Sequence, residues 1–142
     1  MDAEAYSRAL IKAQFCLCPA GDIASPGQRL FDAIAAGCVP ILIGVDKTAL
    51  PLSRQLDYTR FAGFISRLAF LKDPVFACES LLHRLAPQLE QMRRVLADAR
   101  HRLLYGLVDS SNLSTTDPAA FGGVAPHLLQ ELELAVAASV ER

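Results

Sequence analysis

Two short apolar runs enclose a loop and a short helix between Phe15 and Ile43, and this unit most limits what the chain can fold into. Neither run alternates between apolar and polar residues, which is typical of parallel strands buried on both faces. Between them, Gly37 follows the helical stretch where a left-handed C-terminal cap is needed. The pattern predicts a strand over Phe15–Cys18, a loop over Pro19–Gln28, a helix over Arg29–Ala36 and a strand over Val39–Ile43. Polar residues then gather at one end of the strands, where α/β proteins bind ligands.

The rest of the chain extends this α/β pattern. Asp2 is the expected N-cap of a first helix over 2–13. The apolar spacing further predicts a possible short helix over Leu52–Leu56, a strand over Thr59–Ser66, helices over 75–85 and 88–105 separated near Pro87, and a last helix over about 126–140. We therefore expect a Rossmann-like parallel sheet flanked by helices over residues 1–106, a loop or linker over 107–123 and a C-terminal helix over 124–142.

Charge and hydropathy exclude several classes of protein. Lys and Arg number 14 against 15 Asp and Glu, a net charge of -1, so the chain lacks the basic surplus of a nucleic-acid-binding protein. No segment is long and apolar enough to span a bilayer, and Asp2 and Glu4 stand where a signal peptide would be basic. We expect the chain itself to be soluble.

Four cysteines, a number too small for a disulfide scaffold, form no metal-binding pattern. Cys16 and Cys18 lie two residues apart in a predicted strand, so their side chains share one face. We interpret them as small buried apolar residues, with a redox or metal-binding pair as the alternative.

The loop and helix after the first strand carry the residues of an anion site. Gly21 allows the backbone to approach a ligand closely, because it has no Cβ. Asp22 and Ser25 lead into a helix whose first N–H groups lack intrahelical partners and favour phosphate. Arg29, at the helix entrance, can add a bidentate contact to that phosphate. These residues are of the types that hold a nucleotide diphosphate.

Asp32 lies one helical turn beyond Arg29, on the same face of the predicted helix. Its carboxylate can accept hydrogen bonds from two adjacent ribose hydroxyls while Arg29 contacts the diphosphate. The alternative is a surface ion pair between Arg29 and Asp32, worth less than about 1 kcal/mol.

A family resemblance adds to this interpretation. The string Pro19-x-Gly21-Asp22, Ser25, Arg29, Phe31-Asp32, Gly37-Cys38-x-Pro40 resembles the signature of the exostosin-like glycosyltransferases. That family includes plant and algal enzymes that build wall polysaccharides and the animal heparan sulfate polymerases. Leu50-Pro51-Leu52-Ser53 and Leu56-Asp57 also look like the family's stretch after the second strand. The resemblance extends roughly from Tyr6 to Tyr105.

The resemblance implies the two-Rossmann-domain architecture called GT-B, with this chain matching its C-terminal, donor-binding half. The donor would be a UDP-sugar, transferred with inversion to a polysaccharide or glycan acceptor, with no cofactor. Asp32 matches the acidic residue that holds the ribose, which is Glu in many relatives. Arg29 matches the arginine near the diphosphate, and Gly21, Asp22 and Ser25 match the loop.

Other expectations concern what this chain does not supply. The missing N-terminal half would contribute most of the acceptor site and the catalytic base, so this chain alone is expected to be inactive. The family location is the Golgi lumen, with a membrane anchor upstream. The chain has no Asp-x-Asp metal motif, which agrees with a fold that stabilises the departing diphosphate without a bound metal.

Further polar residues have both functional and ordinary interpretations. Lys47 could contact a second phosphate or be a solvated loop residue. Glu79 and His83 have the i,i+4 spacing of two metal ligands, although a surface pair is the simpler interpretation. His101 lies in a basic helical run that we interpret as one solvated face (Arg93, Arg94, Arg100 and Arg102). Asn112-Leu113-Ser114 is a glycosylation sequon that has meaning only in the secretory pathway.

Two hypotheses follow. The first is the nucleotide-sugar-binding half of an exostosin-type glycosyltransferase. The second is a non-catalytic, truncated α/β module that acts through protein contacts. The second is motivated by the missing N-terminal half, by the expected exposed C-terminal helix and by Ala20, since many relatives carry a basic residue at that position.

Overall fold

Three parallel strands form the centre of the fold, in the order β1-β2-β3. The computed structural model describes residues 2–21 and 25–103. Strand β1 spans Phe15–Pro19, β2 spans Val39–Ile43 and β3 spans Gly63–Ile65. Phe15 lies opposite Val39, and Ile41 lies opposite Gly63. Every residue of β2 is buried, as expected for the inner strand of a parallel sheet.

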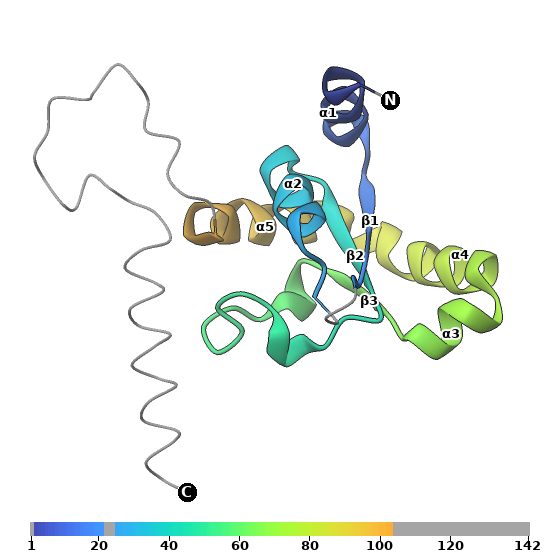
Figure 1. Ribbon diagram of the computed structural model, residues 1–142. Helices are drawn as coiled ribbons and strands as arrows, with labels where there is room; N and C mark the ends of the chain where they lie inside the picture. The colour runs from blue at the N-terminus through green and yellow to red at the C-terminus, as the bar shows by residue number, and fades with distance from the viewer. Residues whose placement is uncertain (1, 22–24, 104–142) are drawn as a thin grey trace, which may run out of the picture.

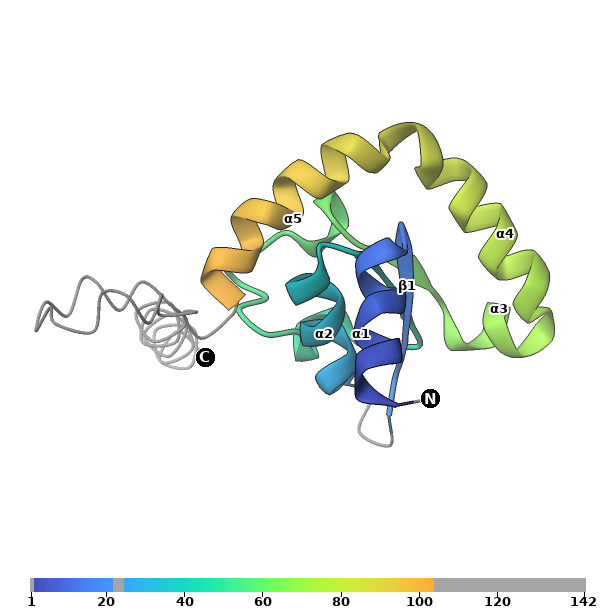
Figure 2. The same cartoon turned by 90° about the horizontal axis from the view of Figure 1, so that it is seen from above.

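Helices cover both faces of this sheet (Figures 1 and 2). The described helices are α1 (Ala3–Lys12), α2 (Gln28–Ala36), α3 (Arg67–Lys72), α4 (Pro74–Leu85) and α5 (Leu89–Leu103). One face packs against α2 and α5 through a large apolar cluster that includes Leu30, Leu42 and Leu96. The other face packs against α4 through a smaller cluster of Ile41, Ile43, Ile65 and Leu81. The predicted α/β class, a Rossmann-like parallel sheet flanked by helices, is confirmed.

Local signals in the sequence account for several element boundaries. The carboxylate of Asp2 accepts a hydrogen bond of 2.7 Å from the Ala5 N–H, so Asp2 caps α1 as predicted. Gly37 ends α2 with φ 71°, the left-handed conformation that favours glycine. Around Pro87, the 3-10 helix Ala86–Gln88 separates α4 from α5, which confirms the predicted break.

Between the second strand and the long helices, two expectations were wrong and one helix was missed. The stretch Leu52–Leu56 is a turn and not a helix, because Leu52 adopts φ 52° and its carbonyl accepts both the Gln55 and Leu56 N–H groups. The third strand covers only Gly63–Ile65, since the 3-10 helix Tyr58–Arg60 takes up its expected start. Helix α3, capped by Ser66, was not predicted.

The interpretation of the cysteines also needs correction. Cys16 and Cys38 form a disulfide, with Cα atoms 5.8 Å apart, whereas Cys18 is a buried free thiol. Cys16 and Cys18 do share one face of β1, as expected. The bond joins β1 to Cys38, the residue directly before β2. Parallel pairing places the start of β2 beside the start of β1, which brings the two cysteines together. Disulfides are typical of oxidising compartments.

The arginines of α5 are not one solvated face. The guanidinium of Arg93 donates to the Ala13 carbonyl at 3.3 Å, and that of Arg102 donates to the Gln55 side chain at 3.0 Å. Both Nε atoms are buried and lack a partner among the described residues. These two arginines therefore join α5 to the end of α1 and to the turn after β2, while Arg94 pairs with Glu90 at the surface.

Some sequence-based expectations lie outside the described residues. These are the segments 107–123 and 124–142, the helix over 126–140, and the sequon at Asn112. Within the part of the chain that is described, no helix has the length and apolar character needed to cross a membrane.

We predict that Cys16→Ser lowers the free energy of unfolding by about 3 kcal/mol, because a cross-link over a loop of this length restricts the unfolded chain. The disulfide closes a sequence separation of 22 residues. Urea denaturation under non-reducing conditions measures the change. Cys78→Ser is the matched control, since Cys78 is a partly exposed free thiol. Equal stability of Cys16→Ser and the wild type would contradict the prediction.

Candidate functional site

The carboxyl ends of the three strands bring separate loops to one edge of the sheet. The Ala20 N–H donates to the Ile43 carbonyl at 2.8 Å, and the Gly44 N–H donates to the Ile65 carbonyl at 2.9 Å. The loop after β1 therefore begins beside the loop after β2, which begins beside the start of α3. This is the edge at which α/β proteins bind ligands.

The loop after β1 closes on itself before α2 begins. The Gly21 N–H donates to the Ser25 carbonyl at 2.8 Å, and the Gly27 N–H donates to the Ser25 hydroxyl at 3.4 Å. Gly21 and Ser25 are thus brought together, while Asp22 lies outside the described residues. A Cβ on Gly21 would lie 3.6 Å from the Ser25 carbonyl oxygen, an ordinary contact, so packing within the loop does not itself require glycine there.

Gly27 is a residue of this loop that sequence reasoning missed. It is the N-cap of α2, with φ 58° and ψ −149°, a conformation essentially restricted to glycine. The dipeptide Pro26-Gly27 directly before a helix was the available signal. Because Gly27 has no side chain, it cannot cap the first N–H groups of α2. The helix therefore begins with a positive partial charge and with Arg29 exposed in its first turn.

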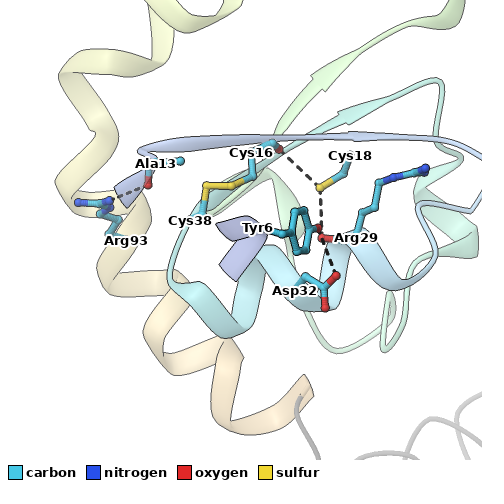
Figure 3. The surroundings of a disulfide bond; sticks show 8 residues. All are labelled: Tyr6, Ala13, Cys16, Cys18, Arg29, Asp32, Cys38 and Arg93. Carbon is cyan, nitrogen blue, oxygen red and sulfur yellow. Dashed lines mark hydrogen bonds between the residues drawn. A yellow bond between two sulfur atoms is a disulfide. The ribbon is translucent and has the colours of Figure 1, made fainter. Parts of the chain in front are cut away.

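Asp32 faces α1 and not Arg29 (Figure 3). Its carboxylate accepts a hydrogen bond of 3.3 Å from the Tyr6 hydroxyl, and no ion pair joins Asp32 to Arg29 among the described contacts. The surface ion pair considered from the sequence is therefore not formed. The two side chains start from the same helix but point apart, so any ligand that contacts both must extend over the first turn of α2.

A groove of about 400 Å³ runs between α1 and α2 beside Asp32. Apolar side chains and small residues line most of it, and Tyr6, Ser7, Gln28 and Asp32 supply its polar groups. Partial burial, followed by the negative charge and the hydrogen bond of Asp32, raises the pKa of Tyr6, so its hydroxyl stays protonated and donates to the carboxylate. The tyrosine thereby positions one oxygen of Asp32 and leaves the other available.

The Cys18 thiol lies beneath this region, within 3.6 Å of the Arg29 carbonyl. Burial raises its pKa to about 11, an effect that the Arg29 charge opposes and the Asp32 charge reinforces. A thiol with such a pKa is protonated at neutral pH and is a poor nucleophile and metal ligand. Cys18 is therefore a packing residue, which agrees with the original interpretation for this one cysteine.

A second pocket, of about 390 Å³, lies between the loop after β2 and Phe64 of β3. The Lys47 ammonium lies 4.6 Å from the centre of the Phe64 ring, which is cation–π geometry. Lys47 is exposed, as a solvated loop lysine would be, but its ammonium also contacts the Phe64 ring at the pocket. No described residue lines both this pocket and the groove beside Asp32.

The remaining candidate residues form no metal-binding cluster in the described part of the chain. Glu79 and His83 are both exposed on α4, and His101 is exposed on α5. No group of three or more potential metal ligands occurs among the described residues.

Comparison with known proteins identifies relatives over much of the chain. The exostosin GT47 domain model matches residues 1–81. A probable arabinosyltransferase, ARAD1, from Arabidopsis thaliana is 32% identical over 101 residues, which cover 71% of this chain and 22% of the relative. A probable glucuronosyltransferase, GUT1, from Oryza sativa subsp. japonica is 35% identical over 63 residues, or 44% of this chain and 15% of the relative. The matched regions thus span less than a quarter of these relatives' length, and no solved structure matches the chain.

We predict that the loop after β2 becomes less stable in acid. Hydrogen bonds from Thr48 and Thr59 lower the pKa values of Asp46 and Asp57, respectively. A carboxyl group whose pKa is lower in the folded state stabilises the fold above its unfolded pKa of about 3.9, and this contribution is lost as pH falls through the folded value. Urea denaturation at pH 7, 5 and 3 should show a smaller acid-induced loss for Asp57→Ala than for the wild type. Asp98→Ala, which changes an exposed residue of α5, serves as the control, and an unchanged acid dependence in Asp57→Ala would contradict the prediction.

Proposed function

The chain belongs to the exostosin GT47 family, and from this premise we propose that it is the nucleotide-sugar-binding part of a glycosyltransferase. The observation that carries the proposal is the start of α2. A helix without a side-chain cap begins at the ligand-binding edge of a parallel sheet, with an exposed arginine in its first turn. Such an arrangement favours a phosphate group.

In this proposal the donor diphosphate lies against the loop after β1 and the first turn of α2. Breaking the bond between sugar and phosphate develops negative charge on the nucleoside diphosphate. Arg29 and the N–H groups at the start of α2 stabilise that charge, which is the main way a fixed site accelerates departure of an anion. Gly21 and Ser25 shape the loop, with Asp22 between them in the sequence.

The nucleoside then occupies the groove between α1 and α2. Asp32 lies in this groove with one oxygen held by Tyr6, and an ionised carboxylate has further acceptor positions for two ribose hydroxyls. The apolar lining and the Tyr6 ring suit a nucleobase, which needs contact with its face more than hydrogen bonds. We propose UDP as the nucleotide, on the family resemblance.

The acceptor, the catalytic base and the stereochemistry of the transfer involve more than the residues of this chain. We propose inverting transfer to a polysaccharide or glycan acceptor, with the catalytic base and most of the acceptor site supplied by an N-terminal half, so that the isolated chain is inactive. The transferred sugar could be a pentose or a hexose acid, because the relatives are named as an arabinosyltransferase and a glucuronosyltransferase. No cofactor is required in this scheme.

The disulfide supports a location in the secretory pathway. Cys16 and Cys38 are bonded and largely buried, and such bonds persist in oxidising compartments. This agrees with the Golgi lumen, which we propose on the family resemblance together with a membrane anchor elsewhere in the full-length protein.

We predict that Arg29→Ala weakens UDP binding at least tenfold, because a hydrogen bond to a charged group contributes about 1.5–3 kcal/mol. Asp32→Ala should weaken UDP but not inorganic phosphate, since it contacts only the ribose. Calorimetric titration of the folded chain measures both. Arg94→Ala and Asp98→Ala, which change exposed residues of α5, are the matched controls.

Wild-type affinity in both site variants would contradict the donor site. A folded wild-type chain that binds no nucleotide would instead favour the non-catalytic module. Exposed apolar residues on α3 and α4 suit that alternative, because they offer a surface for protein contacts (Leu68, Leu71, Val75 and Phe76).

A further inference from the structure

The pocket between the loop after β2 and Phe64 has the features of a second binding site. Its floor includes Leu50 and Tyr58, which are only 4% exposed, and its rim carries Lys47, Arg54 and Asp57. A volume of about 390 Å³ is near the lower end of small-molecule sites and is large enough for a sugar unit.

The loop that forms this pocket is held in place before any ligand arrives. The Tyr58 hydroxyl donates to the Pro51 carbonyl at 2.8 Å, and the Leu52 carbonyl accepts two backbone N–H groups, each at 2.9 Å. Leu52 adopts φ 52°, which is costly for a branched side chain and persists only where its surroundings enforce it. Such strained, well-fixed turns are common beside ligands, and a fixed loop loses little entropy on binding.

The charges of the pocket favour an anion. The Asp57 carboxylate caps its 3-10 helix, with one oxygen accepting from both the N–H and the hydroxyl of Thr59, and its single negative charge stands against two positive charges on the rim. The Lys47 ammonium is held over the Phe64 ring and still has donors for a ligand. Arg54, on the same rim, adds a second positive charge.

We propose that this pocket binds an oxyanion of a sugar-containing substrate, either the carboxylate of an acidic sugar or a phosphate, on Lys47 beside Phe64. Describing the ligand as a sugar substrate rests on the proposed function. Neighbouring strands lie about 4.8 Å apart, so the carboxyl ends of β1 and β3 are about 10 Å apart. The pocket therefore lies further along the edge than the loop after β1.

Sodium glucuronate is the first probe, with glucose as its neutral counterpart, in an NMR titration of the ¹⁵N-labelled chain. We expect glucuronate to shift the amides of Lys47, Leu50 and residues 52–59, and glucose to leave them unchanged. Lys47→Met should weaken glucuronate binding at least fivefold. Phe64→Leu, which keeps an apolar side chain but removes the ring, should weaken it less. Lys12→Met, an exposed lysine at the end of α1, should have no effect.

Saturating UDP then distinguishes the two sources of the oxyanion. Additive shifts from UDP and glucuronate would support an acidic sugar, whereas displacement of glucuronate by UDP would assign the pocket to the donor's phosphates. The absence of glucuronate shifts in the pocket, equal shifts with glucose, or unchanged affinity in Lys47→Met would overturn the proposal. UDP shifts over residues 27–32 test the donor site separately, so failure of one proposal is distinguishable from failure of the other.

Discussion

Parallel pairing of β1 with β2 is the constraint on which the rest of this structure depends. The pairing requires a crossover, which α2 supplies, and it places the carboxyl ends of both strands at one edge. The start of α2 must then lie at that edge, because the helix returns the chain to the opposite end of the sheet. The unpaired N–H groups of α2, the closed loop before it and the loop after β2 come together for this one reason.

The same crossover explains the disulfide. Gly37 ends α2 in a left-handed turn, and Cys38 follows it directly before β2. Because β2 runs beside β1, Cys38 reaches Cys16 with a Cα separation of 5.8 Å. The covalent bond therefore fixes the end of the crossover, while Tyr6 and Asp32 connect α1 to the middle of α2. The helix that carries the proposed phosphate site is thus attached to β1 and to α1.

Two pockets of the described residues carry different polar groups. The groove beside Asp32 lies between helices α1 and α2, and the pocket beside Lys47 lies against β3. Arg29 belongs to neither lining and points away from Asp32 (Figure 3). An extended ligand that crosses the first turn of α2 is the kind of molecule that could contact several of these groups. A nucleotide sugar has that form, with a nucleoside, two phosphates and a sugar in series.

The amino-acid sequence by itself determined the α/β class, the first two strands, α2 with its glycine end, and the gathering of Gly21, Ser25 and Arg29 near one strand end. These features depend on local periodicity, on glycine conformations and on the direction of parallel strands, all of which a short stretch of sequence records. Only the tertiary structure decided the partners of Cys16, Asp32, Arg93 and Lys47. Their partners, Cys38, Tyr6, Ala13 and Phe64, lie 22, 26, 80 and 17 positions away, respectively. Contacts over such separations arise from how helices pack on the sheet, and no local pattern encodes that packing.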